Sequence, residues 1–241
     1  MSHWSFSIGD DSVAVITFTS SKKDASLSLA VVDELADLLE SAARARERIA
    51  VIVLAGEGGS FLPDADRAEI SRLAEGVEVS ELSGDPKAWY RAGESLRSLR
   101  QPSVAVIDGP ASGGACLVAL ACTFRIASER SVFGPVDLSL GIVGTHSSAH
   151  LVRLVGPTIA AELLLRRSEL DAPVAKQTGL LSEVLPDEGF DAQARQWCEA
   201  IATLPRETVF AVKQAVEGST ATSRDDILAT LPPNSRVPTF R

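Results

Sequence analysis

Two apolar segments of this 241-residue chain each end in a glycine, and they constrain its fold more than any other feature. They are IAVIVLAG, at 49–56, and PSVAVIDG, at 102–109. A run of apolar residues without polar alternation is typical of a strand that is buried on both faces, as in a parallel sheet. Helical patterns lie between and after these runs. This alternation predicts an α/β fold with a mostly parallel sheet.

The rest of the chain fits the same fold class. β-Branched and other apolar residues predict further strands over 13–18 and 123–128. Apolar residues at helical spacing predict a helix over 28–46, with Ser28 as its N-cap. From about residue 146 onward the patterns are nearly all helical.

Composition and charge limit the ligands that this chain suits. Hydrophobic residues make up 45% of it, which is enough for a substantial core. The 23 Lys and Arg residues against 32 Asp and Glu give a net charge of −9. Non-specific binding of nucleic acid needs clustered positive charge, so we expect no nucleic-acid partner. The charge still allows an anionic small molecule that is held by a few local cations.

The sequence also indicates where such a protein works. Its first residues lack the basic region, apolar stretch and cleavage site of a secretory signal. No uninterrupted apolar segment approaches ~18 residues, so we expect no membrane span and a cytoplasmic protein. Cys116, Cys122 and Cys198 have no C-x-x-C spacing, which predicts buried free thiols rather than disulfides or a metal site.

The segment GPASGGACLVALAC, at 109–122, places Gly113 and Gly114 at the start of a predicted helix. The first N–H groups of a helix have no partner within it and carry partial positive charge. Without a β-carbon, this backbone can approach a negative oxygen, or it can simply pack closely on the sheet. The segment LAGEGGSFLPDAD, at 54–66, likewise leaves a buried strand through glycines into a loop. Donors from two such loops would form an oxyanion hole, which stabilises charge on a carbonyl oxygen.

The same segments resemble the crotonase superfamily, which includes enoyl-CoA hydratases and isomerases. GEGGSFLPDAD is similar to the family pattern G-x-G-x-x-F-(S/C)-A-G-A-D. VAVIDGPASGGACLVALACTFRIAS is similar to A-x-x-x-G-x-(A/C)-x-G-G-G-x-x-L-A-x-x-C-D-x-R-x-A. FGPVDLSLGIVG and the later HLVRLVG resemble F-x-x-P-E-x-x-L-G-x-x-P-G-G and R-L-x-R-x-x-G. The segments occur in order within 13–185, and together they are highly specific.

The resemblance implies a ββα-spiral core over 1–185 and a shortened helical region over 186–241, which forms subunit contacts and a lid. It implies a homotrimer or hexamer. The implied ligand is an acyl-CoA or acyl-carrier thioester, with no metal and no cofactor beyond the coenzyme A of the substrate. The implied oxyanion donors are the N–H groups of Ala65 and Gly114. The implied substrate contacts are Lys23 (or its neighbour Lys22), Phe61, Leu62, Asp64, Asp66 and Gly113.

The chain departs from the family pattern at both glutamates that hydratases of this family use. The first position falls at Leu117, which cannot carry a proton. The second falls at Asp137, whose side chain is shorter by one methylene and loses about 1.5 Å of reach. Asp137 is then a lone catalytic acid/base, which suffices for the proton transfer of a double-bond isomerase. Its alternative role is that of a turn residue or a helix cap.

Further departures concern the loops and the tail. His146 stands in the segment where the family has glycines, which makes it a second candidate general base. Pro63 and Asp64 stand where the family has a small residue and a glycine, so the loop is stiffer and more acidic. NSRVPTF resembles a closing basic-x-P-x-F motif, but the helix before it looks shortened, which puts the lid and trimer contacts in question.

The leading expectation is an enzyme of the enoyl-CoA hydratase/isomerase type that works through an enolate, with isomerase-like proton transfer by Asp137. One alternative is an acyl-CoA-binding protein without turnover, which Leu117 favours. Another is a different crotonase reaction in a biosynthetic pathway, such as hydrolysis or decarboxylation through His146. A nucleotide-binding Rossmann domain is disfavoured, because neither glycine segment shows G-x-G-x-x-G spacing after the first strand.

Overall fold

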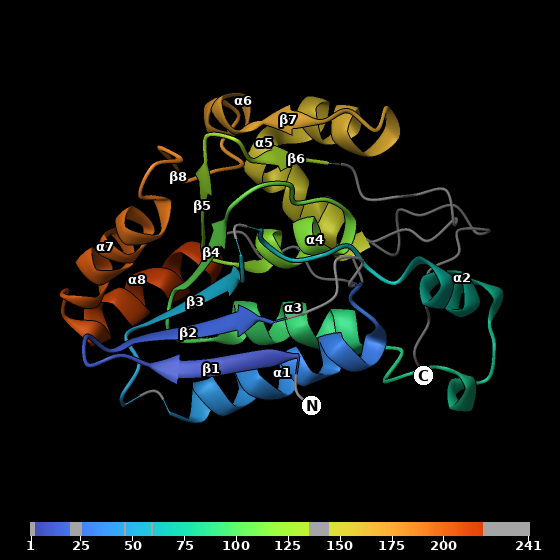
Figure 1. Cartoon of the computed structure of the whole chain (residues 1–241), viewed down its shortest axis with the longest axis horizontal. Helices are drawn as coiled ribbons and strands as arrows, with labels where there is room; N and C mark the ends of the chain where they lie inside the picture. Colours follow the sequence, from blue (N-terminus) through green and yellow to red (C-terminus); the bar gives the residue numbers. More distant parts are fainter. Residues whose placement is uncertain (1–2, 20–25, 46, 59, 135–144, 219–241) are drawn as a thin grey trace.

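The centre of the fold is a six-stranded sheet with the order β1-β2-β3-β4-β5-β8 (Figure 1). The computed structural model describes residues 3–19, 26–45, 47–58, 60–134 and 145–218, without the side chains of 145–147, 217 and 218. β1 pairs antiparallel with β2, and each later pair is parallel. The predicted α/β class is therefore confirmed. The strands are β1 Trp4–Ile8, β2 Val13–Phe18, β3 Val51–Gly56, β4 Ser103–Ile107, β5 Phe124–Ser128 and β8 Glu183–Leu185.

The predicted apolar strands lie in the middle of this sheet. Every residue of β4 is buried, and so are the first four residues of β3. Alternate residues of these strands face two different cores, because successive side chains of a strand point to opposite faces. The strands predicted over 13–18, 49–56, 102–109 and 123–128 are confirmed within two residues at each end.

Helices cover the two faces of the sheet (Figure 1). The larger core lies between one face and α1, α3 and α4. The smaller core joins the other face to α7 through Phe190, Ala194 and Cys198. All three cysteines are free and buried, as predicted. The helices are α1 Leu29–Arg44, α2 Arg67–Glu75, α3 Ala88–Ser98, α4 Gly113–Ala121, α5 Thr145–Leu165, α6 Ala172–Gln177, α7 Phe190–Ala202 and α8 Arg206–Gly218.

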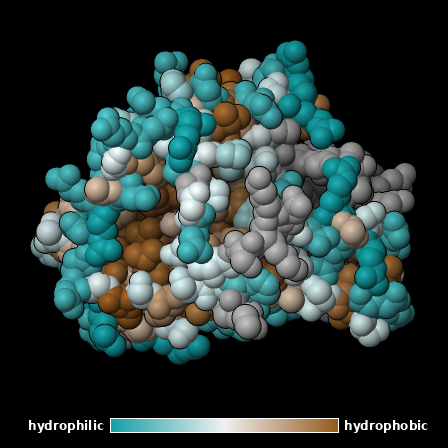
Figure 2. All heavy atoms as spheres, viewed as in Figure 1, coloured by the Kyte–Doolittle hydropathy of each residue, from teal (hydrophilic) through white to brown (hydrophobic). Residues whose placement is uncertain are grey.

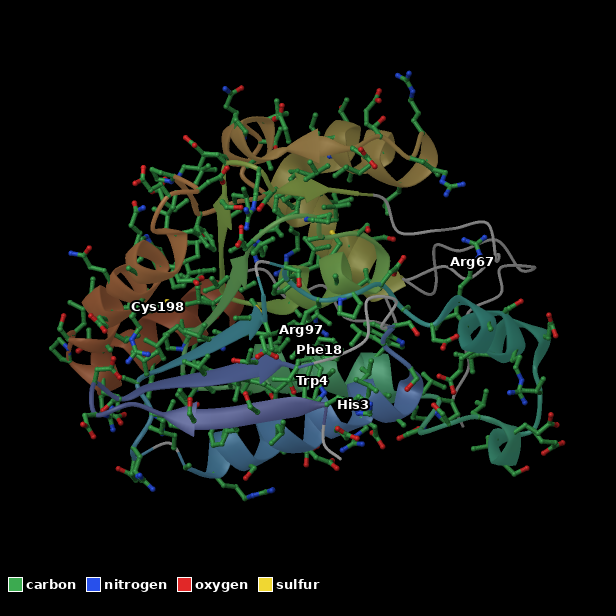
Figure 3. The ribbon with its side chains drawn as sticks, in the orientation of Figure 1. His3, Trp4, Phe18, Arg67, Arg97 and Cys198 are labelled. Carbon is green, nitrogen blue, oxygen red and sulfur yellow. The ribbon has the colours of Figure 1, made fainter. Side chains whose placement is uncertain are left out.

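The first helix is fixed at its start and along its buried side. Ser28 caps α1 as predicted, because its side chain accepts a hydrogen bond from the N–H of Val31. The indole N–H of Trp4, on β1, donates to the carbonyl of Val31 at 2.8 Å. Trp4 also meets the Phe18 ring edge-on, with 5.2 Å between ring centroids, and Figure 3 shows the two side chains together. Edge strand β1, which the sequence patterns did not predict, is thus tied to the core.

Three short elements complete the chain outside the main sheet. β6 (Val132–Phe133) pairs with β7 (Leu170–Asp171) in a second, two-stranded sheet. The 3₁₀ turn η1 (Val79–Glu81) follows α2. The boundary predicted at residue 185 falls at the end of β8, and the division into a core and a helical region stays a prediction.

One helix in the described part of the chain is long and apolar enough to cross a membrane. It is the Ser148–Leu165 part of α5, with a mean hydropathy of 1.3. The left-handed Gly156 (φ 78°) and the following Pro157 break this helix into two shorter ones. Leu151, Ala160 and Leu163 from the two parts are buried in the main core. We therefore interpret α5 as a helix of the folded domain, although only 17% of the apolar stretch is buried within this chain.

Candidate active site

The candidate site lies where two loops leave the carboxyl ends of two neighbouring parallel strands. One loop follows β3 and reaches Ala65, and the other follows β4 and leads into α4 at Gly113. A single parallel bridge between Leu27 and Ala65 fixes the first loop. In this bridge the N–H of Leu27 donates to the carbonyl of Asp64, at 2.8 Å, and the N–H of Asp66 donates back to Leu27, at 2.9 Å. The backbone around Ala65 is held on both sides.

The second loop is fixed in a similar way. The N–H of Ala111 donates to the carbonyl of Val132, at 2.8 Å, and the N–H of Gly134 donates to the carbonyl of Ala111, at 3.0 Å. At the other end of α4, the buried guanidinium of Arg125 donates to the carbonyl of Cys122, the C-cap residue, at 2.6 Å. A cation at the end of a helix satisfies carbonyls that lack an intrahelical partner. The helix that begins with the two glycines is thus held at both ends.

The N–H groups of Ala65 and Gly114 converge on one oxygen atom. That atom is Oδ1 of Asp64, which accepts from Ala65 at 2.6 Å and from Gly114 at 2.7 Å. Ser112, the N-cap residue of α4, makes no side-chain cap hydrogen bond, so the Asp64 carboxylate takes over that role across 50 residues of sequence. Two backbone donors that hold one anionic oxygen form the arrangement that an oxyanion hole requires.

The two glycines are needed because other groups lie against them. A β-carbon on Gly113 would lie 1.9 Å from Oδ1 of Asp64, and the backbone there is left-handed, with a φ of +52°. A β-carbon on Gly114 would lie 2.4 Å from Cη2 of Trp89 and 3.0 Å from the amide nitrogen of Ala65. The bare backbone therefore admits the Asp64 carboxylate, the Trp89 ring and the Ala65 loop.

Trp89, on α3, is a residue of this site that the sequence patterns did not reveal. Its ring packs against Gly114, and its buried indole N–H has no hydrogen-bond partner among the described residues. A buried donor without a partner costs about 1–3 kcal/mol. A tryptophan on a helix more often packs in the core, so nothing in the sequence pattern indicated that Trp89 lies beside Gly114.

The other predicted contacts of the first loop have structural partners. The side chains of Phe61 and Leu62 are buried in the larger core, and their contact with a ligand stays a prediction. Asp66 is the N-cap of α2, where its Oδ1 accepts from the N–H of Glu69 at 3.1 Å. Glu69 in turn accepts from the N–H of Leu29 at 2.7 Å, which ties α2 to the start of α1. These bonds join the end of the first loop to the starts of α2 and α1.

Several predicted residues lie partly or wholly outside the described part of the chain. Lys23 and Asp137 are outside it, and His146 is in the first turn of α5 with its side chain outside it. Leu117 is half-buried, one turn after Gly114 on α4. Residues three apart on a helix share a face, so Leu117 lies on the same face of α4 as Gly114.

The cysteine near these donors is not a nucleophile. Burial raises the pKa of the Cys116 thiol to about 12, and burial raises that of Cys122 to about 12 as well. The thiolate is the reactive form of cysteine, so these side chains are inert at neutral pH.

The sequence matches the enoyl-CoA hydratase/isomerase family over residues 9–230. The chain belongs to this family. It is 30% identical over 194 residues to 2,3-dehydroadipyl-CoA hydratase from Escherichia coli. This alignment covers 80% of this chain and 73% of that protein. It is 31% identical over 218 residues to 4-chlorobenzoyl coenzyme A dehalogenase-1 from Arthrobacter, in an alignment that covers 88% of this chain and 77% of that protein.

The fold agrees with this assignment. The enoyl-CoA hydratase from Bacillus anthracis superposes with a TM-score of 0.78 at 28% identity, covering 94% of this chain and 87% of that one. The resemblance to the crotonase superfamily and its fold is therefore confirmed. At family level the chain is an acyl-CoA enzyme of the hydratase/isomerase type. Relatives of nearly equal identity are named for hydration and for dehalogenation, so identity alone does not select the reaction.

Proposed function

We propose that the Ala65 and Gly114 amides bind the thioester carbonyl of an acyl-CoA and stabilise the enolate formed from it. The observation that carries this proposal is the convergence of the two N–H groups on one anionic oxygen, at 2.6 and 2.7 Å. An enolate oxygen has the same charge and the same need for donors as the carboxylate oxygen that lies there. Donors fixed before the reaction stabilise developing charge without having to reorganise.

The favoured reaction is migration of a double bond, with Asp137 as the acid/base. The base removes a proton from the carbon next to the thioester, and the electron pair moves onto the thioester oxygen between the two amides. The same carboxyl then returns the proton at the far end of the double bond. One titratable group suffices for this sequence. Hydration needs a second group to handle water, and Leu117 supplies none.

The test is turnover on a panel of enoyl-CoAs that differ in chain length and in the position of the double bond. Loss of the conjugated enoyl absorbance reports hydration, and its gain from a non-conjugated substrate reports isomerisation. We expect double-bond migration to exceed hydration. Hydration at the greater rate would contradict the assignment to Asp137 alone.

A second candidate is an acyl-CoA-binding protein without turnover. The observation that favours it is that the two donors are already occupied by Asp64, and the Leu117 side chain cannot carry a proton. Tight binding of several acyl-CoAs, without hydration, isomerisation or hydrolysis, would support this candidate over the enzyme. His146-dependent hydrolysis or decarboxylation would appear in the same assays as release of free CoA or of carbon dioxide.

We further propose that the chain assembles as a homotrimer or hexamer through a surface that includes α5. Only 17% of the apolar Ser148–Leu165 stretch is buried within one chain, and Val152 and Leu165 are 40% and 75% exposed. Figure 2 shows apolar side chains reaching the surface over α5 and β7. Exposed apolar surface of this kind commonly marks a protein–protein contact.

A further inference from the structure

We propose that Asp64 is a specificity-determining residue that competes with the substrate for the oxyanion site, so that a thioester enters only by displacing its carboxylate. The inference rests on the proposed function, because it takes Ala65 and Gly114 as the donors for the thioester. It goes further by assigning Asp64 control over which ligands can use those donors.

The contact geometry supports this competition. Asp64 Oδ1 accepts from both donors at once, and both contacts are short, as is typical of hydrogen bonds to an ionised acceptor. The oxygen therefore stands where a thioester oxygen would bind. Two oxygens cannot occupy one position, and two anionic oxygens in adjacent positions repel each other.

The carboxylate is free to leave because only its side chain has to move. The backbone on both sides of Ala65 is held by Leu27, through the carbonyl of Asp64 and the N–H of Asp66. Asp64 is itself exposed, so rotation about its side-chain bonds transfers the carboxylate to solvent. Rotation of an exposed side chain takes picoseconds to nanoseconds, and the donors stay in place.

Competition of this kind lowers the apparent affinity by the fraction of molecules in which the site is open. A ligand that places no oxygen between the donors escapes this cost. We therefore expect Asp64 to discriminate between the acyl part of a ligand and its CoA part. Free CoA has no thioester carbonyl, so its binding does not require displacement of Asp64.

The experiment measures dissociation constants by calorimetry for the wild type, Asp64→Ala and Asp64→Asn. Its ligands are free CoA and acetoacetyl-CoA, whose acyl group forms an enolate readily. We expect Asp64→Ala to bind acetoacetyl-CoA about tenfold or more tightly than the wild type. We expect Asp64→Asn to lie between them, because its neutral amide oxygen accepts more weakly than a carboxylate. All three proteins should bind free CoA equally.

A spectroscopic reading accompanies the calorimetry. The enolate of acetoacetyl-CoA absorbs in the near ultraviolet, and its bound fraction should rise in the order wild type, Asp64→Asn, Asp64→Ala. Asp10→Asn is the matched control. It removes one carboxylate from the exposed turn before β2, at the amino end of the parallel strands and so away from the site. This control should bind both ligands like the wild type.

The outcomes separate the two proposals. Equal affinity of all variants for acetoacetyl-CoA, or weaker binding by Asp64→Ala, would overturn the role of Asp64 and leave the acyl-CoA site standing. If equal or weaker binding came together with a lower unfolding midpoint for Asp64→Ala, the role of Asp64 would be that of a structural cap of α4. If neither CoA nor acetoacetyl-CoA bound any of the proteins, the proposed function would fail and this inference with it.

Discussion

The carboxylate of Asp64 accepts a hydrogen bond of 2.7 Å from the backbone N–H of Gly114, a residue 50 positions further along the chain. This contact joins the loop after β3 to the start of α4. It places one anionic oxygen where the Ala65 amide also donates. We propose that a thioester oxygen binds at the same two amides and has to displace this carboxylate.

Gly114→Ala should damage both stability and the site. The new β-carbon would lie 2.4 Å from Cη2 of Trp89, so the ring or the helix has to move. Overpacking of this kind costs about 1–3 kcal/mol in the free energy of unfolding, which urea titration measures. Because the Ala65 amide is also within 3.0 Å of this carbon, acyl-CoA affinity should fall too.

Trp89→Phe in the same chain provides the control for that variant. The smaller ring removes the atom that the new methyl group meets, so the double variant should lose less stability than the sum of the two single ones. A double-mutant cycle measures this coupling. Strictly additive losses would show that the methyl group does not meet Trp89.

Much of the scaffold of this site was predictable from the sequence, because local patterns determine it. The apolar run at 49–56 indicated a buried strand, observed as β3, and Ser28 indicated the start of a helix, in both cases without reference to distant residues. Edge strand β1 was missed because it has five residues, three of them exposed. β8 was missed because it has only three residues.

The inner arrangement of the site was less predictable. The two glycine segments indicated a pair of donors, and the structure brings the N–H groups of Ala65 and Gly114 together. The position of the Asp64 carboxylate depends on a rotamer and on a partner 50 residues away, which no local pattern records. The same is true of the Trp89 ring against Gly114.

Asp137→Asn should lower turnover by about 100-fold or more, because general acid–base groups contribute factors of that size. The amide keeps the shape of the side chain and loses the proton, so acyl-CoA affinity should stay within about twofold. Asp137→Glu restores the reach of the family's glutamate and should retain or raise activity. Steady-state kinetics and calorimetry on the same preparations check both values. An Asp137→Asn variant with unchanged kcat would remove this residue from the mechanism.

Charges on the exposed part of α5 should dissociate the assembly. Val152→Glu combined with Leu165→Glu places two carboxylates on surface that we expect a second copy to cover. Sedimentation at micromolar concentration should show a trimer or hexamer for the wild type and a smaller species for the double variant. Val79→Glu, on the exposed turn η1, is the control and should sediment like the wild type. A wild-type protein that sediments as a monomer would contradict the assembly.

Alkaline pH should destabilise the fold in part through Cys116. Burial raises the pKa of this thiol from 9.0 to about 12 in the folded chain. Since the folded pKa is the higher one, the folded state binds the proton more tightly, and its advantage is lost as the pH rises from about 9 to about 12. Urea midpoints at pH 7.5 and 10.5 should fall more for the wild type than for Cys116→Ala. An equal fall in both proteins would contradict the shift.

Binding of a thioester oxygen by the Ala65 and Gly114 amides is best tested by a crystal structure with a saturated acyl-CoA, which cannot form a conjugated product. We predict the thioester oxygen about 2.7–3.1 Å from both amide nitrogens, with the Asp64 carboxylate rotated away. A bound acyl-CoA whose thioester oxygen lies elsewhere, with Asp64 Oδ1 still between the two amides, would contradict the proposed role of these amides.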